Sequence, residues 1–372
     1  MKFSAATVGA ASAMLLVGTS TAISATVADF PVFTGQALRY ALAAVILFAV
    51  LRQQRPPRVR LTVRDALLLV ALAATGLAGF NLFLVEATRH AGPAMIGTVI
   101  GAVPLVMALA GPLMERRRPT PRAVGAALVV ALGTAVAAGL GSGSAKGLLL
   151  SLGALAGEVA FSLLAVPLLP KLGPLRVAAY PAALAVPILL ATGLALEGTD
   201  ALRIPTPSQA AAFAYLGAIV TAAAFFLWYD ALRRLGADRA GLFAGLVPVG
   251  ALLTAVTFGL GQAGPADVVG ALLVAAGVVF GQRRAHALSA PNASIAANGS
   301  PRKASPSSPA LIPAQCANNA AATAPGGVVR PVQNVVVVVL YWASRVQMFA
   351  LAFKGPWAGR VRSAGPPRCP GR

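Results

Sequence analysis

Ten apolar stretches, each close to the length needed to cross a lipid bilayer, constrain this chain more than any other feature. A spanning helix needs about 20 mostly apolar residues, because the bilayer core offers no water to pair with the backbone. The stretches lie at residues 5–25, 31–51, 66–85, 93–114, 123–141, 147–169, 174–196, 209–229, 240–261 and 266–282. The sequence therefore predicts an all-α integral membrane protein with ten transmembrane helices.

The charges agree with a membrane protein better than with a nucleic-acid-binding protein. Only 11% of the residues are charged, against about 25% in an average soluble domain. The net charge of +20 has two sources: short connectors between apolar stretches, and a tail with eleven Lys and Arg from Arg283 onward. Basic connectors are typical of membrane topology. We therefore expect no nucleic-acid partner.

Cysteine and histidine are too sparse to build a reactive centre in the apolar part. Cys316 and Cys369 both lie in the tail, and His90 and His286 are far apart in sequence. A thiolate metal site, a disulfide or a Ser-His-Asp arrangement has almost no material there. We expect no enzymatic activity, no cofactor and no metal site.

The first apolar stretch also resembles a signal peptide, because Lys2 precedes it and small residues follow near Ala25. Its cleavage would leave nine spans and would break an internal repeat. We therefore expect this stretch to remain as the first helix.

The internal repeat appears when residues 86–136 are written over residues 230–280, a constant offset of 144 without gaps. EATRHAGPAMIGTVIGAVP then faces DALRRLGADRAGLFAGLVP. Glycine and proline coincide at Gly92, Gly97, Gly101, Pro104, Pro121 and Gly133 with Gly236, Gly241, Gly245, Pro248, Pro265 and Gly277. General apolar composition does not reproduce such positions, which argues against chance similarity between Ala-rich helices.

Each repeat holds five helices, so the second copy crosses the membrane upside down relative to the first. With the N-terminus inside, the predicted cytoplasmic segments up to Arg284 hold seventeen Lys and Arg, against three outside (Arg89, Lys146 and Arg203). The loop RQQRPPRVRLTVR is basic, whereas its counterpart LEGTDALRIPTP carries one Arg. Positive-inside selection on inverted copies has this effect. We predict two inverted five-helix repeats in an N-in/C-in orientation.

The predicted organisation is a first repeat over residues 1–142, a second over 143–284 and a tail over 285–372. The tail has no acidic residue and a composition that cannot bury a core, so we expect a disordered basic tail. Its apolar segment 335–353 carries Arg345 at its middle, which leaves an eleventh span or an interfacial segment open. Translation beyond the natural stop or in a shifted frame would produce the same change in composition.

Residues 1–283 resemble the EamA group of the drug/metabolite transporter superfamily. The resemblance lies in ALRYALAAVILF, in the segment from LFLVEATRHAGPAMIG to VVALGTAV, and in its second copy from FFLWYDALRRLGADRAG to LLVAAGVVF. It implies a small-molecule transporter: similar proteins export amino acids, metabolites or toxic compounds, and others import sugars or nucleotide precursors. Gln262 stands where an acidic residue is usual, and the first helix lacks the common tryptophan.

Glu158 is the leading candidate for transport chemistry, because it lies midway along the sixth apolar stretch. A central charge costs about 2.5–3.5 kcal/mol on insertion scales unless the group is neutral or faces a cavity. A group that gains and loses a proton could couple substrate movement to a proton gradient. A protonated Glu that bonds a neighbouring helix is the structural alternative.

Polar and aromatic residues in three other stretches are further candidates. Arg39 and Gln36 could hold an anionic group or an acid, although Arg39 could also snorkel to the outer interface. Asn81, Trp228 and Tyr229 would offer hydrogen bonds and aromatic surface, although an interfacial aromatic belt also explains the last two.

Two GxxxG spacings, each followed by a proline, predict helix packing and local bending. They comprise Gly97, Gly101 and Pro104 in the first repeat and Gly241, Gly245 and Pro248 in the second. Glu86 and Asp230 each precede an arginine by three residues, which predicts surface ion pairs.

These features together predict a bacterial inner (plasma) membrane transporter that exports a small metabolite, amino acid or drug-like compound by alternating access, coupled to protons. An importer on the same scaffold and a non-transporting membrane scaffold are the alternatives. The expected partners are the lipid bilayer, a small-molecule substrate and protons, and the sequence leaves a homodimer open.

Overall fold

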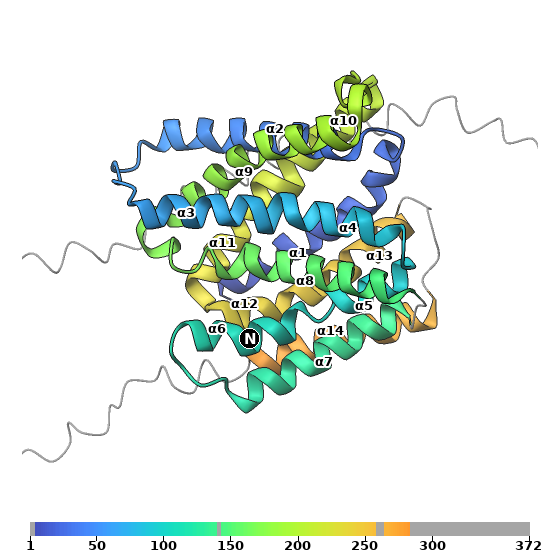
Figure 1. Ribbon diagram of the computed structural model, residues 1–372. Helices are drawn as coiled ribbons and strands as arrows, with labels where there is room; N and C mark the ends of the chain where they lie inside the picture. The colour runs from blue at the N-terminus through green and yellow to red at the C-terminus, as the bar shows by residue number, and fades with distance from the viewer. Residues whose placement is uncertain (1–3, 140–142, 258–263, 283–372) are drawn as a thin grey trace, which may run out of the picture. The chain divides into compact units, whose positions relative to one another are not determined.

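The computed structural model describes residues 4–139, 143–257 and 264–282, which form helices joined by short connectors (Figure 1). Within these ranges nine helices are long and apolar enough to cross a membrane, and α1 (Ala5–Ser24) adds a tenth with an apolar part over Ala5–Thr21. The same residues contain no β-strand, only an isolated β-bridge between Ala91 and Gly143. The predicted ten-helix, all-α membrane fold is confirmed. The predicted tail, with segment 335–353 and both cysteines, lies outside the described residues.

The first five spans are α1, α2, two spans with an internal change of helix type or a break, and the uninterrupted helix α7. The second span is α2 (Val32–Gln54). The third is one continuous helix formed by α3 (Val63–Ala71), η2 (Leu72–Gly79) and α4 (Phe80–Thr88). The fourth consists of α5 (Pro93–Ile100) and α6 (Val103–Met114), and the fifth is α7 (Pro121–Ala138). A short 3-10 turn, η1 (Ala25–Val27), follows α1.

The second five spans repeat this order. The sixth span is α8 (Ala145–Leu163) and the seventh is α9 (Leu169–Leu196). The eighth is one continuous helix formed by α10 (Pro207–Tyr215), η4 (Leu216–Ala223) and α11 (Ala224–Leu235). The ninth consists of α12 (Ala237–Gly241), η5 (Leu242–Leu246) and α13 (Val247–Thr257), and the tenth is α14 (Pro265–Gln282). The 3-10 turn η3 (Gly198–Leu202) follows α9.

Helix ends differ from the predicted ones where an apolar run gives no sign of a turn. The sixth helix, expected to reach residue 169, ends at Leu163. Pro167 has no N–H to donate to the Leu163 carbonyl, which stops the helix there. The chain turns again at Gly173, whose φ of 73° favours glycine. The eighth helix continues to Leu235, beyond the expected residue 229. The apolar run ends near residue 229, but the polar turns that follow it are still helical.

Contacts between helices show a twofold relation between the two halves. The first helix, α1, packs on α11 and α13 of the eighth and ninth spans, and the sixth helix, α8, packs on α4 and α5 of the third and fourth spans. Three other contacts join equivalent spans of the two halves: α2 with α9, α7 with α14, and, between the fourth and ninth spans, α6 with α12. The pairs α6 with α12 and α7 with α14 lie side by side in Figure 1. These contacts interlock the two halves.

Local features recur at the offset of 144 beyond the aligned segment. Thr62 and Asp65 form a capping box at the start of α3, and Thr206 and Gln209 form another at the start of α10. Both helices then pass through a π-helical segment of eight residues, η2 and η4, again 144 residues apart. The repeat therefore reaches back at least to residue 62. The exact division at residues 142 and 284 stays a prediction.

The GxxxG segments lie where helices approach closely. A Cβ added at Gly241 would lie 2.7 Å from the Met107 Cβ, and Gly101 and Gly245 lie against Thr134 and Val130 of α7. Helical structure is interrupted in both segments, between α5 and α6 and in the 3-10 turn η5. Their role as hinges stays a prediction for Gly97, Gly101, Pro104, Gly241, Gly245 and Pro248.

Candidate functional site

Arg39 connects the two halves of the protein through α2 and η4. Its Nε donates to Thr221 Oγ1 at 2.5 Å, and its Nη1 donates to Gln36 Oε1 at 3.4 Å. The Thr221 hydroxyl in turn donates to the Leu216 carbonyl at 2.8 Å, five residues earlier in the π-helical segment. Arg39 is thus held toward the neighbouring helix, which is not the snorkelling position that the sequence left open.

Tyr40 lies beside Arg39 and continues this polar contact to α4. The Arg39 guanidinium carbon lies 5.5 Å from the centre of the Tyr40 ring. Asn81 Nδ2 donates to the Tyr40 hydroxyl at 3.3 Å and to the Leu77 carbonyl at 2.7 Å. Asn81 and Tyr40 are both buried and have little access to water, so each satisfies the hydrogen-bonding capacity of the other.

Trp228 and Tyr229 hold α11 against α8. Trp228 Nε1 donates to Ser162 Oγ at 3.1 Å, and the Tyr229 hydroxyl donates to the Phe161 carbonyl at 3.2 Å. Their exposed fractions are 2% and 0%, which is not the position of a lipid-facing aromatic belt.

Four rings join these contacts into one aromatic cluster, defined as Tyr40, Phe161, Phe225 and Tyr229. The ring centres of Phe161 and Phe225 lie 4.7 Å apart, and those of Phe161 and Tyr229 lie 5.1 Å apart. Tyr40 completes the cluster at 6.3 Å from Phe225. Helices α2, α8 and α11 therefore meet over a continuous aromatic surface.

Glu158 lies beside this aromatic cluster, one turn before Ser162 on α8. Phe161, one ring of the cluster, lies three residues further along the same helix. No fully buried side-chain oxygen or nitrogen among the described residues lacks a partner, and Glu158, itself half-buried, makes no hydrogen bond or ion pair with another described residue. Its carboxyl group is therefore not completely enclosed by other side chains.

All six predicted candidates, namely Glu158, Arg39, Gln36, Asn81, Trp228 and Tyr229, belong to this one region of α2, α4, α8 and α11. Sequence analysis missed Tyr40, Thr221, Phe161 and Phe225. A hydroxyl residue in an apolar stretch was a signal for Thr221, because a polar group inside a membrane span needs a partner. The two phenylalanines had no such signal.

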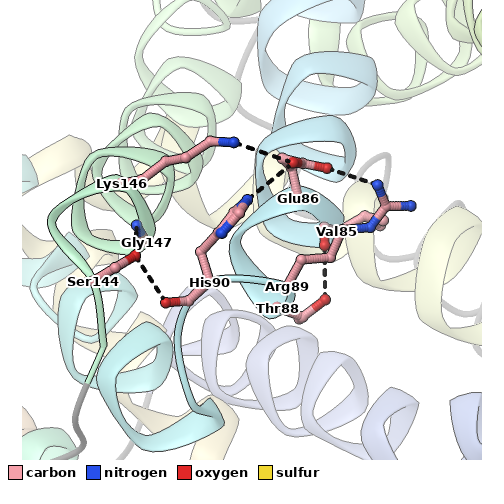
Figure 2. Close-up of polar contacts among 8 residues, drawn as sticks. All are labelled: Val85, Glu86, Thr88, Arg89, His90, Ser144, Lys146 and Gly147. Atoms are coloured by element: carbon pink, nitrogen blue, oxygen red, sulfur yellow. Dashed lines mark hydrogen bonds and ion pairs between the residues drawn. The ribbon is translucent and has the colours of Figure 1, made fainter.

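A second polar region surrounds Glu86 at the end of α4 (Figure 2). The Glu86 carboxylate pairs with Arg89 at 3.1 Å and His90 at 3.3 Å, and lies 3.9 Å from Lys146 of the second half. Ser144 Oγ donates to the His90 carbonyl at 3.1 Å. The predicted surface ion pairs are confirmed here and at Asp230, which binds Arg233 at 2.9 Å.

Two five-helix halves that interlock through contacts between equivalent spans define a polytopic membrane protein of the internal-repeat class. The EamA-like transporter family model matches residues 4–139 and again residues 145–281, more than half of the chain. The chain therefore belongs to the EamA-like transporter family, as the sequence resemblance implied, and is a multi-pass membrane protein.

Two known proteins illustrate this relationship. The chain is 24% identical over 254 residues to the uncharacterized transporter YetK of Bacillus subtilis (strain 168), a match that covers 66% of this chain and 77% of that protein. A protein of known crystal structure superposes with a TM-score of 0.64 at 21% identity, over 76% of this chain and 98% of the solved chain. This structural likeness concerns the fold alone.

Proposed function

We propose that the chain is a proton-coupled exporter of a small metabolite, amino acid or drug-like compound in the bacterial inner (plasma) membrane. The observation that carries the proposal is the Glu158 carboxyl group, which lies in the middle of a span and has no hydrogen-bond or ion-pair partner among the described residues. A structural carboxyl group at this depth would be expected to bind a neighbour, because an unpaired polar group in a membrane is costly.

Proton coupling follows from the surroundings of Glu158. A low-dielectric cavity favours the neutral form of any carboxyl group, and entry of water favours the ionised form. Alternating access fills and empties such a cavity from each side in turn. Glu158 would then take up a proton on one side of the membrane and release it on the other.

The same region offers substrate contacts from both halves. Arg39 has donors that its bonds to Thr221 and Gln36 leave free, so its guanidinium group can bind an anionic group of the substrate. The aromatic cluster supplies a surface for apolar or ring-shaped parts of the substrate. The Arg39 contact depends on the junction of α2 with η4, and the aromatic cluster depends on the junction of α2 with α8 and α11. Movement of one half against the other therefore changes both contacts.

Export is tested by untargeted mass spectrometry of the medium from cells that express the wild type, Glu158→Gln or Glu115→Gln at equal membrane abundance. We expect a compound that accumulates outside with the wild type and with Glu115→Gln, but not with Glu158→Gln. Glu115 is the matched control because its carboxylate only pairs with Arg117 in an exposed connector.

Each other outcome contradicts part of the proposal. Equal export by all three proteins would make Glu158 structural. An unchanged medium together with uptake of a compound by the wild type would reverse the direction to import. No difference in either assay would leave a non-transporting scaffold as the better description.

A further inference from the structure

A cavity of about 190 Å³ opens between the ends of α2, α4 and α9, away from the Glu158 region. These ends lie on the side predicted to face outward. The transport proposal does not use this cavity. Its lining residues are Val32, Phe33, Leu82, Val85, Glu86, Arg89, Leu196 and Glu197.

The apolar part of the lining faces the bilayer. Val32, Leu82 and Leu196 are 38%, 39% and 63% exposed, although they belong to membrane-spanning helices. Large apolar side chains exposed on such helices contact lipid rather than water. The cavity is therefore open to lipid on its apolar side.

The charged part of the lining lies at the helix ends, where lipid headgroups are found. Glu86 and Arg89 end α4, and Glu197 ends α9. The cavity is thus charged at the helix ends and apolar along the spans. A membrane leaflet has the same order, from its headgroups to its hydrocarbon core.

The volume decides what size of group can enter. Pockets that enclose a whole drug-sized ligand measure about 300–1,000 Å³, so this cavity is too small for one. It suits a group the size of a lipid headgroup, whose chains remain outside along the apolar helix surfaces.

The charges favour a headgroup that carries both signs. Two carboxylates, Glu86 and Glu197, line the cavity from opposite halves of the chain. Glu197 already accepts from the Phe33 amide at 2.8 Å and from the Thr34 amide and hydroxyl at 3.4 and 3.2 Å, which leaves acceptor capacity on Oε1. An ammonium group in the cavity therefore has a carboxylate from each half among its neighbours.

Arg89 supplies the opposite charge. Its side chain is 69% exposed and makes one ion pair within the described part of the chain, the 3.1 Å pair with Glu86, so donors remain for a phosphate. Lys146 Nζ lies 3.9 Å from Glu86 Oε1 and balances the charge of the second carboxylate. The local charge is close to neutral, which disfavours a purely anionic headgroup.

We propose that this cavity binds the headgroup of a phospholipid with a primary amine, its ammonium group between Glu86 and Glu197 and its phosphate at Arg89. The lipid comes from the leaflet that surrounds the outer ends of α2, α4 and α9. It joins the end of α4 in the first half to the end of α9 in the second.

The test is native mass spectrometry of the full chain in detergent with phosphatidylethanolamine or phosphatidylcholine of identical acyl chains. The two headgroups differ only by methylation of the amine, which removes its donors. We expect the wild type to retain phosphatidylethanolamine about threefold to tenfold better, the effect of one net hydrogen bond. Phosphatidylglycerol is included as the anionic alternative.

Variants separate the amine contact from the phosphate contact. Glu86→Gln should abolish the preference for phosphatidylethanolamine and leave phosphatidylcholine unchanged, whereas Arg89→Ala should weaken both lipids. Asp230→Asn and Arg233→Ala are matched controls, because they remove the repeat-equivalent ion pair at the end of α11. Leu82→Trp, which fills the cavity without changing a charge, should weaken both lipids.

Equal retention of the two lipids by the wild type, or an unchanged preference in Glu86→Gln, would overturn the amine assignment. Stronger retention of phosphatidylglycerol would overturn it as well. Normal binding by Leu82→Trp, with an unchanged unfolding midpoint, would show that this cavity is not the site. The assay needs no substrate, so its failure and the failure of the transport proposal are distinguishable.

Discussion

At the scale of single residues, the contact between Arg39 and Thr221 shows how a polar group is accommodated inside the membrane domain. The two residues are 182 positions apart, yet the guanidinium group donates to a hydroxyl that is itself bonded to the backbone of its own helix. Thr221 is fully buried, so it is fixed in position and orients the Arg39 side chain. Arg39 therefore depends on the other half of the protein.

Thr221→Val should lower both stability and export, because it leaves the Arg39 Nε without an acceptor. An unsatisfied buried group costs about 1–3 kcal/mol. Thr221→Ser keeps the hydroxyl and should retain most of the export rate. The checks are the thermal unfolding midpoint in detergent and the export assay at equal membrane abundance. Export by the Val variant at the Ser level would show that Thr221 does not position Arg39.

The sequence could identify candidate residues but not their partners. Glu158 and Arg39 stood out because charges inside apolar stretches are costly, and this signal does not depend on the fold. Phe161 and Phe225 could not be found, because an aromatic residue in an apolar helix is equally suited to lipid and to a protein interior. Whether such a ring faces Tyr40 depends on helix rotation, which a uniformly apolar sequence does not set.

At the scale of elements, the π-helical segments η2 and η4 are the feature shared most closely by the two halves. Each lies in the middle of a long span, directly before the helices that carry Asn81 and Trp228. A π-helical turn holds an extra residue and rotates the side chains on either side of it, and such turns are frequent at functional sites. In η4 it directs the Thr221 hydroxyl to the Leu216 carbonyl.

Deleting Ala223 should convert η4 to a regular α-helix and abolish export. One residue fewer rotates the start of the span by about 100° relative to α11, which separates Thr221 from Arg39. The control deletes Thr199 from the exposed connector η3, a change of length that rotates no span in the site. Circular dichroism should show equal helix content in both variants. Normal export after loss of Ala223 would mean that the π-helical segment has no part in function.

At the scale of the whole molecule, the count of helices and the order of the repeat could be predicted because they depend on length and periodic composition. Apolar stretches must be about as long as the bilayer is thick, so their number is written directly in the sequence. Helix ends such as Leu163 could not be placed, because the chain stays apolar through the following turn. The contact of α7 with α14 also required the structure.

The predicted N-in/C-in orientation can be measured with single cysteines in a background in which Cys316 and Cys369 are replaced by Ser. A membrane-impermeant maleimide should label Thr199→Cys in intact spheroplasts, and Arg118→Cys only after the membrane is opened. Both positions are exposed in connectors. The basic connector around Arg118 belongs inside by the positive-inside rule. The opposite labelling pattern would invert the topology.

The pairing of α2 with α9 and of α7 with α14, each a helix and its own copy, also bears on how such a chain arises. When a surface contacts its own copy across a twofold axis, both sides of the interface are the same surface, so a single unit carries everything that the interface needs. One five-helix ancestor, inserted into the membrane in both directions, would already have had the means to assemble into the full carrier. Gene duplication and fusion would then require no new interface, because they would only join the two orientations in one chain. After fusion, each half could change its residues independently of the other.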